Sequence, residues 1–194
     1  MTQLLDKTRD TLMNFPGTWE SFKLIQQGLT DSPGIKLAYH NGTIELLMPG
    51  QDHEFFKSLI GYLLETFFYD KGIKFKPTGS MTQEKETEAS AQADESYCLG
   101  ELKPIADLAI EVVFTSGGES NLSRYKALKV SEVWFWQNGL FTLHHLREDG
   151  YERIYRSELP GLNDLDIDLL TRCVLIAQTD NGEAVRVFRQ GIAN

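Results

Sequence analysis

A glutamate stands inside an otherwise apolar segment near the middle of the chain. Glu111 lies in the stretch ADLAIEVVFTSGG, residues 106–118, where valine, isoleucine and phenylalanine are the commonest neighbours. These residue types favour a buried β-strand, and a carboxylate in such a strand must be ion-paired, protonated or bound to a ligand. Glu111 is therefore the first residue to consider for chemistry.

Alternation along this strand gives the direction of the carboxylate. Over residues 107–114, Glu111 shares one face with Asp107, whereas the opposite face is wholly apolar and predicts contact with a core. Four strand residues span roughly 13 Å at about 3.3 Å per residue, so these two carboxylates cannot easily bind one metal ion together. A partner for Glu111 must come from another strand.

The preceding predicted strand, over residues 93–99, offers Asp94 in the segment QADESYCL. Neighbouring strands lie about 4.8 Å apart, so Asp94 and Glu111 can converge. Two carboxylates together with water suit Mg²⁺, which takes oxygen ligands and keeps several waters. The alternative is that Glu111 is a structural residue that is ion-paired with Arg124 or Lys126.

The elements that position these residues follow from local sequence signals. Mixed helices and strands predict an α/β or α+β protein around one sheet, and the acidic stretch 84–96 predicts a loop. The first half of the chain predicts a helix over 18–28 that Thr18 caps, a hairpin at Asn41-Gly42, a helix over 53–69 that Asp52 caps and an edge strand over 73–83. Strands over 93–99 and 107–114 follow, and then a helix that Ser120 caps. The chain then predicts a meander over 131–157, with turns at Asn138-Gly139 and Asp149-Gly150, and a closing helix within 162–178.

Composition narrows the class of protein and its partners. The 194 residues, 41% of them hydrophobic, predict one domain over 1–194. A formal net charge of −9 argues against a surface built as a whole to bind nucleic acid, so a polyanionic substrate needs a local basic patch or a bound cation. Two cysteines, no apolar leader and no membrane-length apolar run predict a reduced, cytoplasmic protein without membrane contact. Six basic residues could hold a nucleic-acid backbone: Lys71, Lys74, Lys76, Arg124, Lys126 and Lys129. The alternative is that they only form solvated faces.

Several segments in order resemble the Uma2 family of endonucleases, within the broader PD-(D/E)XK nuclease-like superfamily. They are TWESFKLI, LAYHNGTIELLMPGQDHEFF, ADESYCL, ADLAIEVVFTSGG and YKALKVSEVWFW, which together span most of the chain. The resemblance implies a single restriction-endonuclease-like domain with a mixed central sheet flanked by helices. It also implies a Mg²⁺-dependent endonuclease, with Mn²⁺ as a substitute, that acts on nucleic acid, on DNA before RNA.

The resemblance also assigns residues. Asp94 stands at the first acidic position, with Ala93 in place of the usual proline, and Glu111 stands at the second; both would hold the metal. Glu54, near the start of the long helix, matches a third acidic position and would act through water, unless it only favours the positive end of that helix. His53-Glu54 lacks a second histidine four residues on and is no zinc-protease motif.

The chain departs from the superfamily pattern at its lysine. Val113 stands two residues after Glu111, where the superfamily motif has lysine, and Asn121 stands where Uma2-like sequences supply lysine from the following helix. Asn121 can donate a hydrogen bond but carries no charge, so it stabilises the negative charge that develops on the phosphate less than a lysine would. We therefore expect weak cleavage, which Asn121→Lys should raise. Arg124 or Lys126 would substitute only if the helix were rotated. The alternative is a noncatalytic binding or assembly domain that retains the nuclease fold; the sequence leaves open whether the protein forms a homodimer.

Overall fold

The computed structural model describes residues 9–32, 34–114 and 118–193, and in them two β-sheets carry the architecture. Sheet A has the strand order β1-β3-β2-β6-β5 and sheet B the order β11-β10-β9-β8-β7-β4. The strands of sheet A are β1 (Thr11–Pro16), β2 (Lys36–His40), β3 (Thr43–Met48), β5 (Thr82–Lys85) and β6 (Ala89–Gln92). Those of sheet B are β4 (Phe75–Pro77), β7 (Glu95–Leu99), β8 (Leu108–Val113), β9 (Glu132–Gln137), β10 (Leu140–Leu146) and β11 (Tyr151–Ile154).

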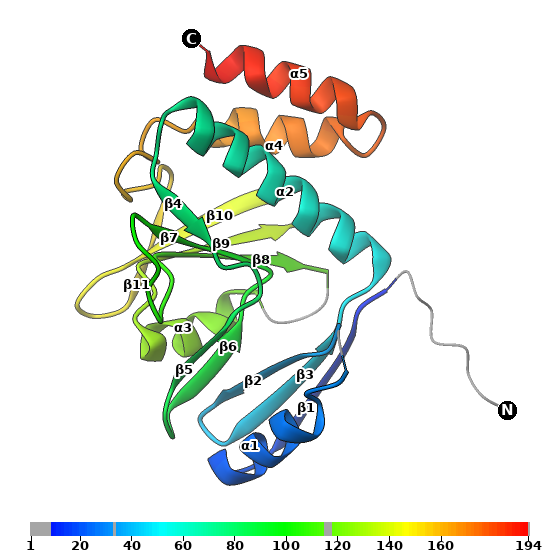
Figure 1. The fold of residues 1–194 in the computed structure, drawn as a ribbon, viewed down its shortest axis with the longest axis vertical. Coiled ribbons are helices and arrows are strands. Elements are labelled where there is room, and N and C mark those ends of the chain that lie inside the picture. The colour runs from blue at the N-terminus through cyan, green and yellow to red at the C-terminus, as the bar shows by residue number, and fades with distance from the viewer. Residues whose placement is uncertain (1–8, 33, 115–117, 194) are drawn as a thin grey trace, which may run out of the picture.

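Helices lie on both sides of sheet B (Figure 1). The mixed α/β class is confirmed, and helices α2, α4 and α5 cover one face while α3 covers the other. The helices are α1 (Trp19–Gly28), α2 (Gln51–Asp70), α3 (Leu122–Leu128), α4 (Ile167–Ile176) and α5 (Asn181–Ile192), with a 3₁₀ turn, Gly118–Asn121, leading into α3. No helix of the part that the structure describes is long and apolar enough to cross a membrane.

The expectation of one sheet is wrong, because the acidic stretch 84–96 is not a loop. Strands β5 and β6 form a hairpin there, and β6 pairs with β2 to complete sheet A. The turn of this hairpin places Thr87 at φ 61°, a left-handed conformation without the glycine that usually announces it. Ala89 and Ala91 on β6 are fully buried against α3, so small side chains hid a core strand.

Strand β8 lies near the middle of sheet B, antiparallel to β7 and parallel to β9. Its residues Leu108, Ile110 and Val112 pack into the large core beneath α2, α4 and α5, as the alternation predicts. Ala109 faces the opposite way, toward Tyr125 of α3. The crossover from β8 to β9 through α3 therefore places α3 over the face that carries Glu111.

The helix starts agree with the sequence except in two caps. Thr18 caps α1 through Ser21 N–H at 3.2 Å, as expected. Helix α2 begins at Gln51 after Gly50, so Asp52 lies in its first turn and does not cap it. Helix α3 has Asn121, not Ser120, at its N-cap position. The turns at Asn41-Gly42 and Asn138-Gly139 are confirmed as hairpins β2–β3 and β9–β10, and β11 follows Gly150.

Candidate functional site

Asp94, immediately before β7, is fully buried and bonded on both oxygens. Its Oδ2 accepts the Val112 N–H at 2.6 Å, and its own N–H donates to the Ile110 carbonyl at 3.0 Å, so β8 fixes its position. Its Oδ1 accepts from His53 Nε2 at 2.7 Å and from the Lys36 ammonium. Burial alone would raise the pKa of Asp94, but the charge of Lys36 and the bond from His53 lower it to about 2. Asp94 is therefore an anion.

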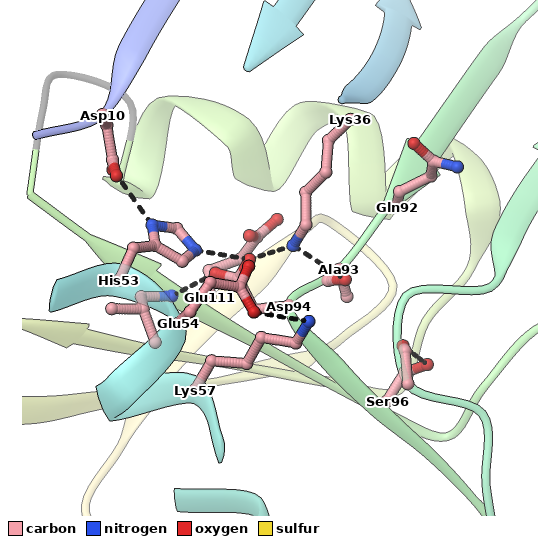
Figure 2. Close-up of polar contacts among 12 residues, drawn as sticks. Asp10, Lys36, His53, Glu54, Lys57, Gln92, Ala93, Asp94, Ser96 and Glu111 are labelled. Carbon is pink, nitrogen blue, oxygen red and sulfur yellow. Dashed lines mark hydrogen bonds and ion pairs between the residues drawn. The ribbon is translucent and has the colours of Figure 1, made fainter. Parts of the chain in front are cut away.

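His53 extends this contact into a row of alternating charges, Asp10, His53, Asp94 and Lys36 (Figure 2). Its Nδ1 lies 2.9 Å from Asp10 Oδ2, while Asp10 Oδ1 accepts the Gly50 N–H at 2.8 Å. Burial opposes the charged imidazole, but the bonds from the two carboxylates raise the pKa of His53 to about 9. The imidazole is thus protonated at neutral pH and donates from both nitrogens. The sequence pattern around His53 excluded a zinc-protease motif but did not predict that His53 binds two carboxylates.

Lys36 reaches Asp94 from the other sheet. Its Nζ also donates to the Ala93 carbonyl at 3.2 Å, and only 12% of its side chain is exposed. The sequence analysis missed Lys36, although alternation in β2 holds a signal: Leu37 and Tyr39 pack under α1, so Lys36 must face the other way. What covers that second face depends on how the two sheets dock, which local sequence patterns do not specify.

Glu111 lies on β8 beneath α3. Its Oε1 accepts from the Tyr125 hydroxyl and lies 3.9 Å from Arg124 Nη2, and Arg124 Nη1 donates to Glu45 Oε1 at 3.1 Å. Burial and the nearby negative charge of Asp94 raise the pKa of Glu111 to about 7. The structure thus brings Asp94 and Glu111 close enough for their charges to interact, as the strand geometry predicts.

The structural alternative for Glu111 also finds support in its contact with Arg124. Lys126 does not take part, because its Nζ donates to the Asp149 carbonyl at 2.7 Å. Arg124 is 7% exposed, and its Nε has no hydrogen-bond partner in the described part of the chain. The residue therefore carries one N–H that the fold leaves unsatisfied, a costly arrangement unless something else binds it.

A small cavity opens beside Glu111, between sheet A and α3. Its volume is about 40 Å³, enough for about three water molecules or an ion with part of its hydration shell, but not for a nucleotide. Asn121 lines this cavity, so the residue at the expected lysine position does face the site. The charged side chains that line the cavity, among the described residues, are Asp10, Lys36, Glu45, Glu111 and Arg124.

Two other carboxylates considered from the sequence lie apart from this cavity. Glu54 is in the first turn of α2, its side chain half exposed and 3.4 Å from Lys57 Nζ. Asp107 accepts the Leu99 N–H at 2.7 Å and pairs with Lys103 at 2.7 Å. Neither lines the cavity.

The chemistry of the donors suits a small hard cation, with one condition. Carboxylates on neighbouring strands beside a cavity of this size could hold Mg²⁺ with a few waters. Within the described ranges, however, no three histidine, cysteine or acidic side chains are grouped to hold a metal ion. The Lys36 ammonium contacts Asp94 Oδ1. A metal ion that binds Asp94 must therefore displace Lys36.

The two sheets and their helices define a mixed α/β protein that carries a buried acidic pair. The chain belongs to the Uma2 family, whose model, described as "putative restriction endonuclease", matches residues 19–171. Its fold is similar to a crystal structure from Anabaena variabilis described as a "putative nuclease belonging to DUF820". That match has a TM-score of 0.58 at 15% identity and covers 82% of this chain and 99% of the other. Comparison with curated proteins gives no match.

Proposed function

We propose that this protein is a Mg²⁺-dependent endonuclease that hydrolyses phosphodiester bonds in nucleic acid, with DNA as the first candidate substrate. The observation that carries the proposal is the buried acidic pair of Asp94, immediately before β7, and Glu111 on β8. Of the two, Glu111 lines the cavity, together with Lys36 and Arg124. Membership of a family described as restriction endonucleases supports the same reaction class.

In the proposed reaction a water oxygen bonds to phosphorus as the ester P–O bond breaks. The water gives up one proton, and the departing sugar oxygen takes one. A magnesium ion, when bound, would supply positive charge to the phosphate and favour ionisation of water. Asp94 and Glu111 would hold the ion. Tyr125 would fix the orientation of Glu111 through its hydroxyl, and Arg124, which also lines the cavity, would stabilise charge on the phosphate.

The second candidate function is a noncatalytic binding or assembly domain that retains the nuclease fold. Asn121 in place of a lysine supports it, as does the direct neutralisation of Asp94 by Lys36, which holds the acidic pair together without a metal ion. Metal binding alone does not separate the two functions, because a noncatalytic site can still bind a cation.

Cleavage of a mixed substrate panel separates them. Single-stranded and duplex DNA and RNA are incubated with Mg²⁺ or Mn²⁺ and the natural chain, the Asp94→Ala/Glu111→Ala double variant, or Asp107→Asn as a matched acidic control. An endonuclease cuts internal bonds of circular and linear substrates, the double variant does not, and the control retains cleavage. If the natural chain and the double variant are equally inactive while both remain folded, the binding domain is the better assignment.

A calorimetric titration tests the ligands of the metal. Manganese should bind the natural chain and Asp107→Asn alike, whereas Glu111→Gln should lose most of the binding heat, because Glu111 lines the cavity and Asp107 does not. Thermal unfolding of each variant controls for loss of structure. A titration in which Asp107→Asn loses binding and Glu111→Gln keeps it would overturn the proposed geometry.

A further inference from the structure

We propose that Lys36 of β2 supplies the ammonium group that Asn121 lacks, and that this group contacts the scissile phosphate during cleavage. The role rests on the proposed endonuclease function and adds a catalytic residue from the other sheet. It explains how a site without the expected helix lysine retains a mobile positive charge.

The position of Lys36 carries the first step of the argument. Its side chain lines the same cavity as Glu111 and Asn121, so a lysine at position 121 and the lysine at position 36 would approach one space from different elements. Its charge also acts on both acidic residues, lowering the pKa of Asp94 and opposing the rise in that of Glu111. Lys36 therefore contacts Asp94 directly and lines the same cavity as Glu111.

The other basic side chains of the neighbourhood are committed elsewhere. Lys126 bonds the Asp149 carbonyl, and Arg124 is held by Glu45 and lies near Glu111. Lys36 differs because its main partner, Asp94, is also the proposed metal ligand. A divalent cation on Asp94 would release the ammonium, and the flexible lysine stem then allows it to turn toward a phosphate in the cavity mouth.

Arg124 supplies an independent sign that an anion belongs in this place. Its buried Nε has no hydrogen-bond partner in the described part of the chain, and its side chain lines the same cavity as Lys36. A phosphate oxygen would accept from this N–H, while the released ammonium would contact another oxygen of the same group. Negative charge that develops as water attacks and the ester bond breaks would then meet two cations.

The test exchanges the lysine between the two positions. The cleavage panel compares the natural chain with Lys36→Met, with Asn121→Lys and with the Lys36→Met/Asn121→Lys double variant. Lys85→Met on β5 is the control for loss of an exposed positive charge. We expect Lys36→Met to lower kcat/KM about a hundred- to a thousandfold. Contrary to the expectation from the sequence alone, Asn121→Lys should then change cleavage by the natural chain little, but it should restore much of the loss in the double variant.

A second readout does not depend on cleavage. Lys36→Met should bind Mn²⁺ at least about tenfold more tightly than the natural chain, because it removes the resident cation from Asp94, whereas Lys85→Met should not. If Lys36→Met fails to fold in thermal unfolding, Lys36→Gln takes its place, since an amide can still donate to Asp94 and the Ala93 carbonyl.

The outcomes separate the two proposals. Cleavage by the natural chain that both Lys36 variants retain in full overturns the role of Lys36 alone. Cleavage that Asn121→Lys raises strongly in the natural background shows that the missing lysine has no substitute, and it also overturns the role. If neither the natural chain nor Asn121→Lys cuts any substrate, the endonuclease proposal fails and the catalytic role of Lys36 fails with it, even where the manganese affinities differ as expected.

Discussion

At the scale of single residues, the site is held together by charges that compensate one another over short distances. His53 is the clearest case, because it bonds two carboxylates, Asp10 and Asp94, in a buried setting. Without its proton one of these bonds would lose its donor, since a neutral imidazole carries only one N–H. The protonated state of this side chain is therefore part of the folded structure.

Replacing this imidazole should make stability depend on pH in a defined way. The pKa of His53 is about 9 in the folded chain against 6.5 when unperturbed, so its stabilisation is complete below pH 6.5 and is lost as pH rises through 9. We expect His53→Gln to lower the free energy of unfolding by on the order of 2–3 kcal/mol at pH 6, and by clearly less at pH 9.5. Urea unfolding at the two pH values measures this, with His40→Gln as the control; an equal loss at both would contradict it.

At the scale of elements, short sequence patterns correctly predicted the turns, the first helix cap and the buried face of β8. The Asn-Gly turns, the Thr18 cap and the alternation of β8 were all readable, because each depends on a few neighbouring residues. The order of the strands also predicted that Asp94 and Glu111 lie close together. The hairpin β5–β6 was not, because its turn lacks glycine and its strand β6 is built from alanine, serine and glutamine.

The parts of the site that escaped prediction are those that depend on contact between distant elements. Lys36 and Glu45 looked like ordinary polar positions of a hairpin, and only the docking of sheet A against β8 and α3 makes them site residues. The same holds for Asp10 at the start of β1, a strand that the sequence analysis did not predict. Periodicity identifies the face on which a side chain lies, but not the surface that this face meets.

Helix α5 was also not predicted as a separate element, yet it closes the large core over α2 and α4. Phe188 is fully buried in that core, whereas its neighbour Arg189 is exposed. Phe188→Ala should lower the free energy of unfolding by about 3–5 kcal/mol through lost burial and a cavity, and Arg189→Ala by less than about 0.5 kcal/mol. Chemical denaturation of both variants checks this; a small effect of Phe188→Ala would show that α5 frays from the core.

At the scale of the whole molecule, the net charge of −9 opposes the approach of a polyanion. Few positive charges face the site, and the two in the cavity are Lys36 and Arg124. Under the proposed function, nucleic acid would therefore be held by a small number of contacts and by the proposed cation, and not by an extended basic surface.

This charge distribution predicts a shallow salt dependence for oligonucleotide binding. With two phosphate-contacting cations on single-stranded DNA, the logarithm of the association constant should fall with the logarithm of salt concentration with a slope of about −1.4, and Lys36→Met should make the slope shallower by about 0.7. Fluorescence anisotropy with short single-stranded DNA measures it. A slope near −6 would instead show that lysines away from the cavity, such as Lys74 and Lys76 beside β4, hold the backbone.

The row from Asp10 to Lys36 has a consequence for the order in which the chain acquires its structure. Its bonds join residues separated by 41 to 58 positions, and Lys36 and Asp94 come from different sheets. Contacts of such long sequence separation form after local helices and hairpins, because the chain must first close large loops. During refolding, helical signal should therefore recover before metal binding does. The recovery of metal binding at the proposed site would then mark the last step of folding, in which the two sheets dock.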